Sequence, residues 1–427
     1  MRVHNALYFS IYFLLLGNVF FVMMHLDALS SNIYWWSLKN YVADANSYFE
    51  IALGLAVDII LSVVILLLWP RYLKFWLLKS YVAFFVIIYQ EALYGLDAYY
   101  YYAEAVHNSA NHGYLGTGMV IQINHLFSYL VGDSYFSLKI FNAFIGFLAL
   151  ILLYRTYQEV LRHSNVTERN DIFMYVLFLF PSILLFSTHI GKDTLNLFLV
   201  ALFLHGFIGF NTRRRWHYLL YMAVSLLGIY YIRVWWPVIM LLSVLLFYIR
   251  LHSFKHFMML MVTVPIFAAI FLNFLSFSNI DSFEAVFAKM NDTLQNLSYG
   301  GSGTQSSQIA GFADYLFYFV PNAFTAIFRP LPFDITSPLI LLAAVENSFL
   351  LYFFYKYILK EWSAVMTNPS TKFLLLFIFS WSLFYAIISP GNLGMAIRFK
   401  LQILPAMLMI FFIIRAQKRA PDATVTA

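Results

Sequence analysis

The sequence predicts an all-α polytopic membrane protein with about 12 transmembrane helices, long extracytoplasmic loops and interfacial helices. Two observations lead to this class. Of the 427 residues, 62% are hydrophobic and only 11% are charged, whereas a typical soluble domain has about 25% charged residues. The hydrophobic residues also come in runs of about 20, the length that a helix needs to cross a bilayer. A soluble globular enzyme is therefore excluded.

Charge and cysteine content narrow the function classes. The sequence has no cysteine, which excludes disulfides, thiolate metal ligands and thiol nucleophiles. Its formal net charge is +6. In a membrane protein such an excess reports on topology, so no nucleic-acid partner is expected.

Twelve apolar runs are expected to span the bilayer, and because no internal repeat divides them we predict a single integral membrane domain over 1–427. The first run is too long for a signal peptide and is interpreted as a retained helix. In order, the runs are Ala6–Leu26, Ile51–Trp69, Phe75–Tyr94, Tyr135–Leu153, Ile172–His189, Thr194–Phe210, Tyr218–Ile232, Val234–Tyr248, Phe257–Leu275, Ile335–Tyr355, Phe373–Ile388 and Leu401–Ile414.

Basic residues predict the orientation of these helices. Most of the 26 lysines and arginines fall in alternate connections, and the positive-inside rule then places both termini in the cytoplasm. The opposite side receives three long connections, at 27–50, 95–134 and 276–334. Leu115–Val131 is expected to be an interfacial helix in the second loop, and Tyr315–Phe328 a re-entrant or interfacial segment in the third.

Four basic residues lie at the outer ends of helices, where the insertion rule does not call for them. They are Lys192, Arg233, Arg329 and Arg398. Each alone is explained equally well by snorkelling to lipid or by pairing with an acid such as Asp193. Four in one layer favour a site for a phosphate or diphosphate headgroup, because Arg offers a planar fork to phosphate oxygens and Lys a point charge.

Asp97 is the candidate general base. It follows the third run and precedes a row of tyrosines, among which Tyr100 could form a wall for a sugar face. The alternative for Asp97 is a helix N-cap. Asp44 in the first outer loop and His107 further along the second are further candidates. No metal site is predicted, since no third ligand accompanies the histidines; no cofactor is certain, although a divalent metal could assist.

Several short motifs recur in a distinctive order. They are Asp97 with its tyrosines, Phe180–Ser182, Gly191–Asp193, Arg329–Phe333, Glu346–Asn347, Asn392–Gly394 and Arg398. The set resembles the membrane proteins of bacterial polysaccharide gene clusters, namely C-type glycosyltransferases and O-antigen or exopolysaccharide polymerases.

The resemblance implies a polyprenyl-phosphate- or diphosphate-linked sugar donor, handled on the extracytoplasmic face of the bacterial inner (plasma) membrane. It also implies a sugar or lipid-linked acceptor. In such proteins the acid usually follows the first helix, so Asp44 is the alternative counterpart of Asp97. Lys192, Arg329 and Arg398 would be the cations on the phosphate side.

The leading hypothesis is therefore a membrane glycosyltransferase of the hexosyltransferase kind, in cell-surface polysaccharide or glycolipid assembly. Asp97 would accept the proton of the acceptor hydroxyl, and the outer cations would stabilise the leaving phosphate. The alternatives are a repeat-unit polymerase and a lipid-linked oligosaccharide transporter, which should show paired broken helices. A membrane acyltransferase is weaker, because His205 is the only histidine well inside a span and no motif accompanies it.

Overall fold

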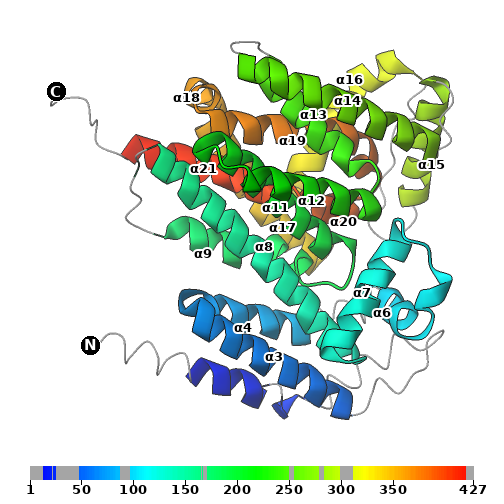
Figure 1. Ribbon diagram of the computed structural model, residues 1–427, viewed down its shortest axis with the longest axis vertical. Coiled ribbons are helices and arrows are strands. Elements are labelled where there is room, and N and C mark those ends of the chain that lie inside the picture. The colour runs from blue at the N-terminus through cyan, green and yellow to red at the C-terminus, as the bar shows by residue number, and fades with distance from the viewer. Residues whose placement is uncertain are drawn as a thin grey trace. The chain divides into compact units, whose positions relative to one another are not determined.

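The computed structural model describes residues 13–21, 23–25, 48–86, 97–164, 166, 171–249, 254–277, 283–298 and 311–419. Within these ranges all regular elements are helices (Figure 1), as the sequence predicts. The chain divides into two compact units. The first comprises Met1–Leu152 and Phe178–Ala201, and the second comprises Leu153–Leu177 and Leu202–Ala427. Each unit is described by itself, and the single domain over 1–427 stays a prediction.

The helical elements follow one another with short connections. In chain order they are α3 (Tyr48–Leu68), η1 (Pro70–Tyr72), α4 (Leu73–Tyr81), η2 (Val82–Val86), α6 (Ala98–His107), η3 (Ser109–Asn111), α7 (Thr117–Val131), α8 (Tyr135–His163), α9 (Ile172–Leu179), α10 (Pro181–Phe186), α11 (Lys192–Arg213), α12 (His217–Ile232), α13 (Trp236–Tyr248), α14 (Phe254–Phe277), α15 (Phe283–Ser298), α16 (Phe312–Phe328), η4 (Pro332–Asp334), α17 (Pro338–Phe354), η5 (Tyr355–Leu359), α18 (Trp362–Thr367), α19 (Pro369–Ile388), η6 (Ser389–Gly391), α20 (Leu393–Lys400) and α21 (Leu404–Arg419).

Five described helices are long and apolar enough to cross a membrane, and a bent pair makes a sixth. The five are Phe49–Leu68, Tyr135–His163, Lys192–Arg213, Phe257–Ser276 and Pro369–Ile388. The bent pair, α20 and α21, turns by 56° at its break. The predicted helix Leu401–Ile414 therefore begins later, at Leu404, and runs to Arg419. The described helices are consistent with a helical membrane protein, and the full count of about 12 crossings stays a prediction.

One predicted span is broken. Ile172–His189 is not continuous, because α9 ends at Leu179 and α10 begins at Pro181, with Phe180 in an extended conformation between them. Proline disfavours a helical conformation in the preceding residue and suits the first position of a helix. By contrast, α16 continues through Pro321.

In the first unit, residues 13–21 lie against α3 and α4. Asn18 Nδ2 donates to Asp58 Oδ2 at 2.6 Å and to Ser80 Oγ at 2.9 Å. Asn18 and Asp58 are both buried. A carboxyl group inside an apolar helix is costly unless it faces protein partners, and these contacts provide them.

In the second unit, α19 packs against α13, α16 and α21 (Figure 1). Its buried Trp381 and Tyr385 rings are stacked at a centroid distance of 4.6 Å. Helices α11 and α12 approach closely at Gly209, where an added Cβ would lie 2.3 Å from Cε1 of Tyr218. Glycine is therefore required at that contact.

Candidate functional site

The short helix α20 carries Arg398, one of the four cations that the sequence predicts for phosphate binding. Asn392 caps it, accepting a hydrogen bond from the Met395 amide at 3.0 Å. Asparagine is a preferred N-cap residue, and here it starts a new helix directly after the Ser389–Gly391 turn. Arg398 and Lys400 occupy the last turn of α20, where Lys400 is buried and Arg398 half-buried.

Arg233 reaches α20 from the end of α12. Its side chain is only 6% exposed. Nη1 of Arg233 donates to the Tyr385 hydroxyl at 3.0 Å, and its guanidinium carbon lies 5.5 Å from the centroid of the Phe399 ring on α20. Trp236 Nε1 donates to the same hydroxyl at 3.0 Å. These contacts hold the guanidinium beside α20 in a mainly aromatic environment.

Lys400 links α20, through Asn347 of α17, to the backbone next to Arg329. Its ammonium donates to Asn347 Oδ1, and Asn347 Nδ2 donates to the carbonyl of Pro330, next to Arg329, at 2.9 Å. Glu346 is also buried and interacts electrostatically with Lys400. Lys400 was absent from the predicted site residues. The signal that could have found it is a lysine within an apolar stretch, two positions after Arg398.

Arg329 is paired with an acid. Its Nε donates to Asp334 Oδ2 at 3.0 Å, its Nη2 contacts the other carboxylate oxygen, and the Leu331 amide donates to Oδ2 at 2.8 Å. The hydrogen bond from Arg329 holds the pKa of the Asp334 carboxyl below its usual value. Arg329 therefore pairs with a nearby acid, which is the alternative to phosphate binding that the sequence leaves open for each outer cation.

In the first unit, the helix of Asp97 and the turn of Lys192 lie together. The Tyr101 amide donates to the Asp97 carbonyl at 3.0 Å. The Tyr101 ring faces Gly191, where an added Cβ would lie 3.3 Å from its Cε2. Lys192 begins α11 and donates from Nζ to Thr117 Oγ1 at the start of α7, at 2.9 Å.

The side chain of Asp97 does not act as a cap. Asp97 occupies the N-cap position of α6 but makes no side-chain cap hydrogen bond, and it is exposed. Asp97 therefore lies at the N-cap position, as the alternative interpretation expects, but its side chain does not bond to the backbone of α6. Asp193 is buried, whereas Tyr100 is 36% exposed and His107 is exposed at the end of α6.

The remaining predictions concern Asp44 and a metal site. Asp44 lies outside the described residues. Across the described residues, no group of three or more His, Asp or Glu side chains is arranged to hold a metal ion.

Lys79 of α4 is a buried cation of the first unit. It is 1% exposed, and it donates to Ser187 Oγ at 2.5 Å and to Thr188 Oγ1 at 3.0 Å. Hydroxyl partners more than 100 residues away in the sequence hold the ammonium inside the first unit.

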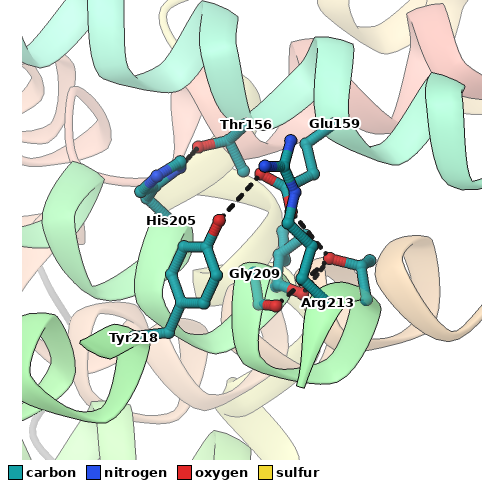
Figure 2. A network of polar contacts seen from close by, with 8 residues as sticks. Thr156, Glu159, His205, Gly209, Arg213 and Tyr218 are labelled. Carbon is teal, nitrogen blue, oxygen red and sulfur yellow. Dashed lines mark hydrogen bonds and ion pairs between the residues drawn. The ribbon is translucent and has the colours of Figure 1, made fainter. Parts of the chain in front are cut away.

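A polar network joins three helices of the second unit (Figure 2). Glu159 accepts from Arg213 Nε at 2.6 Å, from Thr212 Oγ1 at 2.9 Å and from the Tyr218 hydroxyl at 3.4 Å. His205 Nδ1 lies 2.9 Å from Thr156 Oγ1. This contact gives the half-buried His205 a partner within the bundle, and the acyltransferase alternative stays a prediction.

The predicted residues thus divide between the two units. Asp97, Tyr100, His107, Lys192 and Asp193 belong to the first unit, and Arg233, Arg329 and Arg398 belong to the second. No protein-family model, curated protein or solved structure matches the chain. Fold and site together define an α-helical protein with several candidate membrane-spanning helices and a partly buried group of cations around α20.

Proposed function

We propose that the α20 cation cluster, defined as Arg233, Arg329, Arg398 and Lys400, binds the phosphate of a polyprenyl-phosphate- or diphosphate-linked sugar. One observation supports this proposal above the others. Arg233, 167 positions before Lys400, lies against Phe399 of α20. Lys400 itself bonds to Asn347, which bonds to the backbone carbonyl next to Arg329. Buried cations in an apolar bundle are costly and usually functional. Arginine forks and a lysine ammonium together suit a phosphate group.

The reaction we propose is glycosyl transfer on the extracytoplasmic face of the membrane, with both termini in the cytoplasm. The acceptor hydroxyl attacks the anomeric carbon, the bond between that carbon and the phosphate oxygen breaks, and the lipid phosphate leaves with the bonding electrons. The α20 cation cluster stabilises the negative charge that grows on the phosphate. The hydroxyl proton goes to a general base, for which Asp97 is the candidate from the sequence and Asp44 the alternative.

Transport of a lipid-linked oligosaccharide is the second candidate. Carriers bind their substrates near broken helices. The interruption between α9 and α10 and the 56° bend between α20 and α21 are features of that kind. A polymerase differs from a single-sugar transferase only in its acceptor, so the same site serves both.

The test uses the full-length protein in lipid nanodiscs with a polyprenyl-diphosphate-linked sugar and a soluble acceptor. We expect wild-type protein to form product. Arg398→Ala should lower the rate by roughly 10²–10³-fold, by analogy with the loss of one donor that stabilises a transition state. Asp97→Asn should abolish most activity. Lys418→Ala is the matched control, since Lys418 is 56% exposed and pairs with Glu361.

The outcomes separate the candidates. Wild-type rates in both Arg398→Ala and Asp97→Asn would refute these assignments. Movement of the intact lipid-linked sugar across a liposome membrane, without any product, would exclude glycosyl transfer and favour transport.

A further inference from the structure

The second unit contains a cavity of about 420 Å³ at the end opposite α20. The lining includes Asn368, which is the N-cap of α19, and Pro369 and Ser370, which are the first two residues of that helix. Tyr385, which contacts Arg233, lies 16 residues further along the same helix, roughly 24 Å away at 1.5 Å per residue. The cavity is therefore distinct from the α20 cation cluster.

Three phenyl rings contribute to the apolar part of the lining, together with Ile208, Ala364 and Pro369, and of these rings only that of Phe247 is half-buried. Phe207 and Phe373 are buried and stack with a centroid distance of 3.6 Å. The Phe247 ring stands edge-on to both, at 5.3 Å from Phe207 and 5.8 Å from Phe373. Aromatic faces carry partial negative charge and attract weakly positive C–H groups.

The rest of the lining is polar but almost uncharged. It includes the amides of Asn211, Asn368 and Gln417 and the hydroxyls of Ser164, Thr212 and Ser370. His163 is the only titratable residue in the lining. Three cations lie next to the lining. Arg213 pairs with Glu159 and Lys418 with Glu361, and Nζ of Lys372 lies 5.8 Å from the centroid of the Phe247 ring. The lining thus lacks the fixed cations that phosphate recognition requires.

Several of these polar side chains have hydrogen-bonding capacity to spare. Within the part of the chain that the structure describes, the side chains of Ser164, Ser370 and Gln417 make no hydrogen bond, and all three are half-buried. The N-terminus of α19 offers little, since Asn368 Oδ1 already accepts from the amides of Ser370 and Thr371. Uncharged donors and acceptors are therefore what the cavity presents to a ligand.

We propose that this cavity binds a neutral saccharide. The C–H face of a sugar ring would lie on the half-buried Phe247 ring, and its hydroxyls would bond to the amides and hydroxyls of the lining. The volume falls within the range of about 300–1,000 Å³ that is usual for small-molecule pockets. The same chemistry occurs in a free saccharide and in the headgroup of a neutral glycolipid, so the experiment separates these two sources.

The experiment uses the full-length protein in nanodiscs prepared without glycoside detergents, whose sugar headgroups would compete. Saturation-transfer NMR is recorded with glucose, galactose and maltose, and with glucose 1-phosphate and AMP as charged probes. A second arm measures competition with vesicles that contain monoglucosyl-diacylglycerol or phosphatidylglycerol. We expect at least one neutral sugar to bind, with glucose 1-phosphate binding no better than glucose.

Two variants test the location of binding. Gln417→Leu removes an amide that has no partner in the described protein, and Phe247→Ala removes one ring; each should weaken binding about 5–10-fold, the equivalent of one lost hydrogen bond or ring contact. Ser363→Ala, on the exposed face of α18, should bind as wild type.

Absence of binding by every neutral sugar, wild-type affinity in both cavity variants, or stronger binding of the charged probes would each overturn the proposal. Displacement of the bound sugar by glucolipid vesicles, and not by phosphatidylglycerol vesicles, would assign the site to a glycolipid headgroup. Retention of the sugar in the presence of both kinds of vesicle would assign it to a soluble saccharide. Neither result depends on the α20 cation cluster, because Arg398→Ala should leave sugar binding at the cavity unchanged.

Discussion

Replacing Tyr385 with phenylalanine removes one hydroxyl that accepts two buried hydrogen bonds. Arg233 Nη1 and Trp236 Nε1 both donate to it at 3.0 Å, and Tyr385 is 1% exposed. The loss should cost about 2 kcal/mol for the charged donor and about 1 kcal/mol for the neutral one. The stacking on Trp381 is preserved, so the cost comes from the hydrogen bonds alone.

A total of about 3 kcal/mol corresponds to a fall of about 6 °C in Tm, at roughly 2 °C per kcal/mol for a large domain. The assay is thermal unfolding followed by the intrinsic fluorescence of the nine tryptophans, since a chain without cysteine cannot report through a thiol dye. Tyr248→Phe is the matched control. Its hydroxyl donates a neutral hydrogen bond to Asn211 Oδ1 at 2.9 Å, and the loss of that bond should lower Tm by only about 2 °C.

Equal effects of Tyr385→Phe and Tyr248→Phe would refute the reasoning, because the two-donor geometry at Arg233 would then contribute nothing measurable. Tyr385→Phe should also weaken binding of polyprenyl phosphate, which Tyr248→Phe should not.

Two further predictions concern packing and pH. Gly209→Ala places a Cβ 2.3 Å from the Tyr218 ring and should destabilise the second unit by about 1–3 kcal/mol; Gly113→Ala, which has open space, should leave Tm unchanged. Because Arg329 lowers the pKa of Asp334 in the folded state, this pair stabilises the protein above the unfolded pKa of about 3.9. That contribution should disappear as the pH falls through the lower folded pKa, and Asp334→Asn should flatten the acid side of the Tm–pH curve.

The sequence predicts most of the described helices because apolar runs of about 20 residues have few other solutions in a bilayer. The break at Phe180 could also have been predicted, from Pro181. The 56° bend before Leu404 carries a similar local signal, since Pro405 is the second residue of α21. The burial of Lys79 has none, because it depends on hydroxyls contributed by a distant segment.

The candidate site shows the same division between local and long-range information. Arg233, Arg329 and Arg398 were identified as unusual by position alone. Their common relation to α20 depends on Phe399, Asn347 and Pro330, contacts that no local pattern encodes. Local sequence indicated which charges needed explanation, and only the fold indicated their partners.

The most direct test of the α20 cation cluster is native mass spectrometry of the full-length protein with polyprenyl phosphate and with the corresponding uncharged polyprenol. We predict that wild-type protein retains the phosphate and not the alcohol, and that Arg233→Met combined with Arg398→Ala loses this preference while Lys418→Ala keeps it. Equal retention of phosphate and alcohol by wild-type protein, or an unchanged preference in the double variant, would contradict the account.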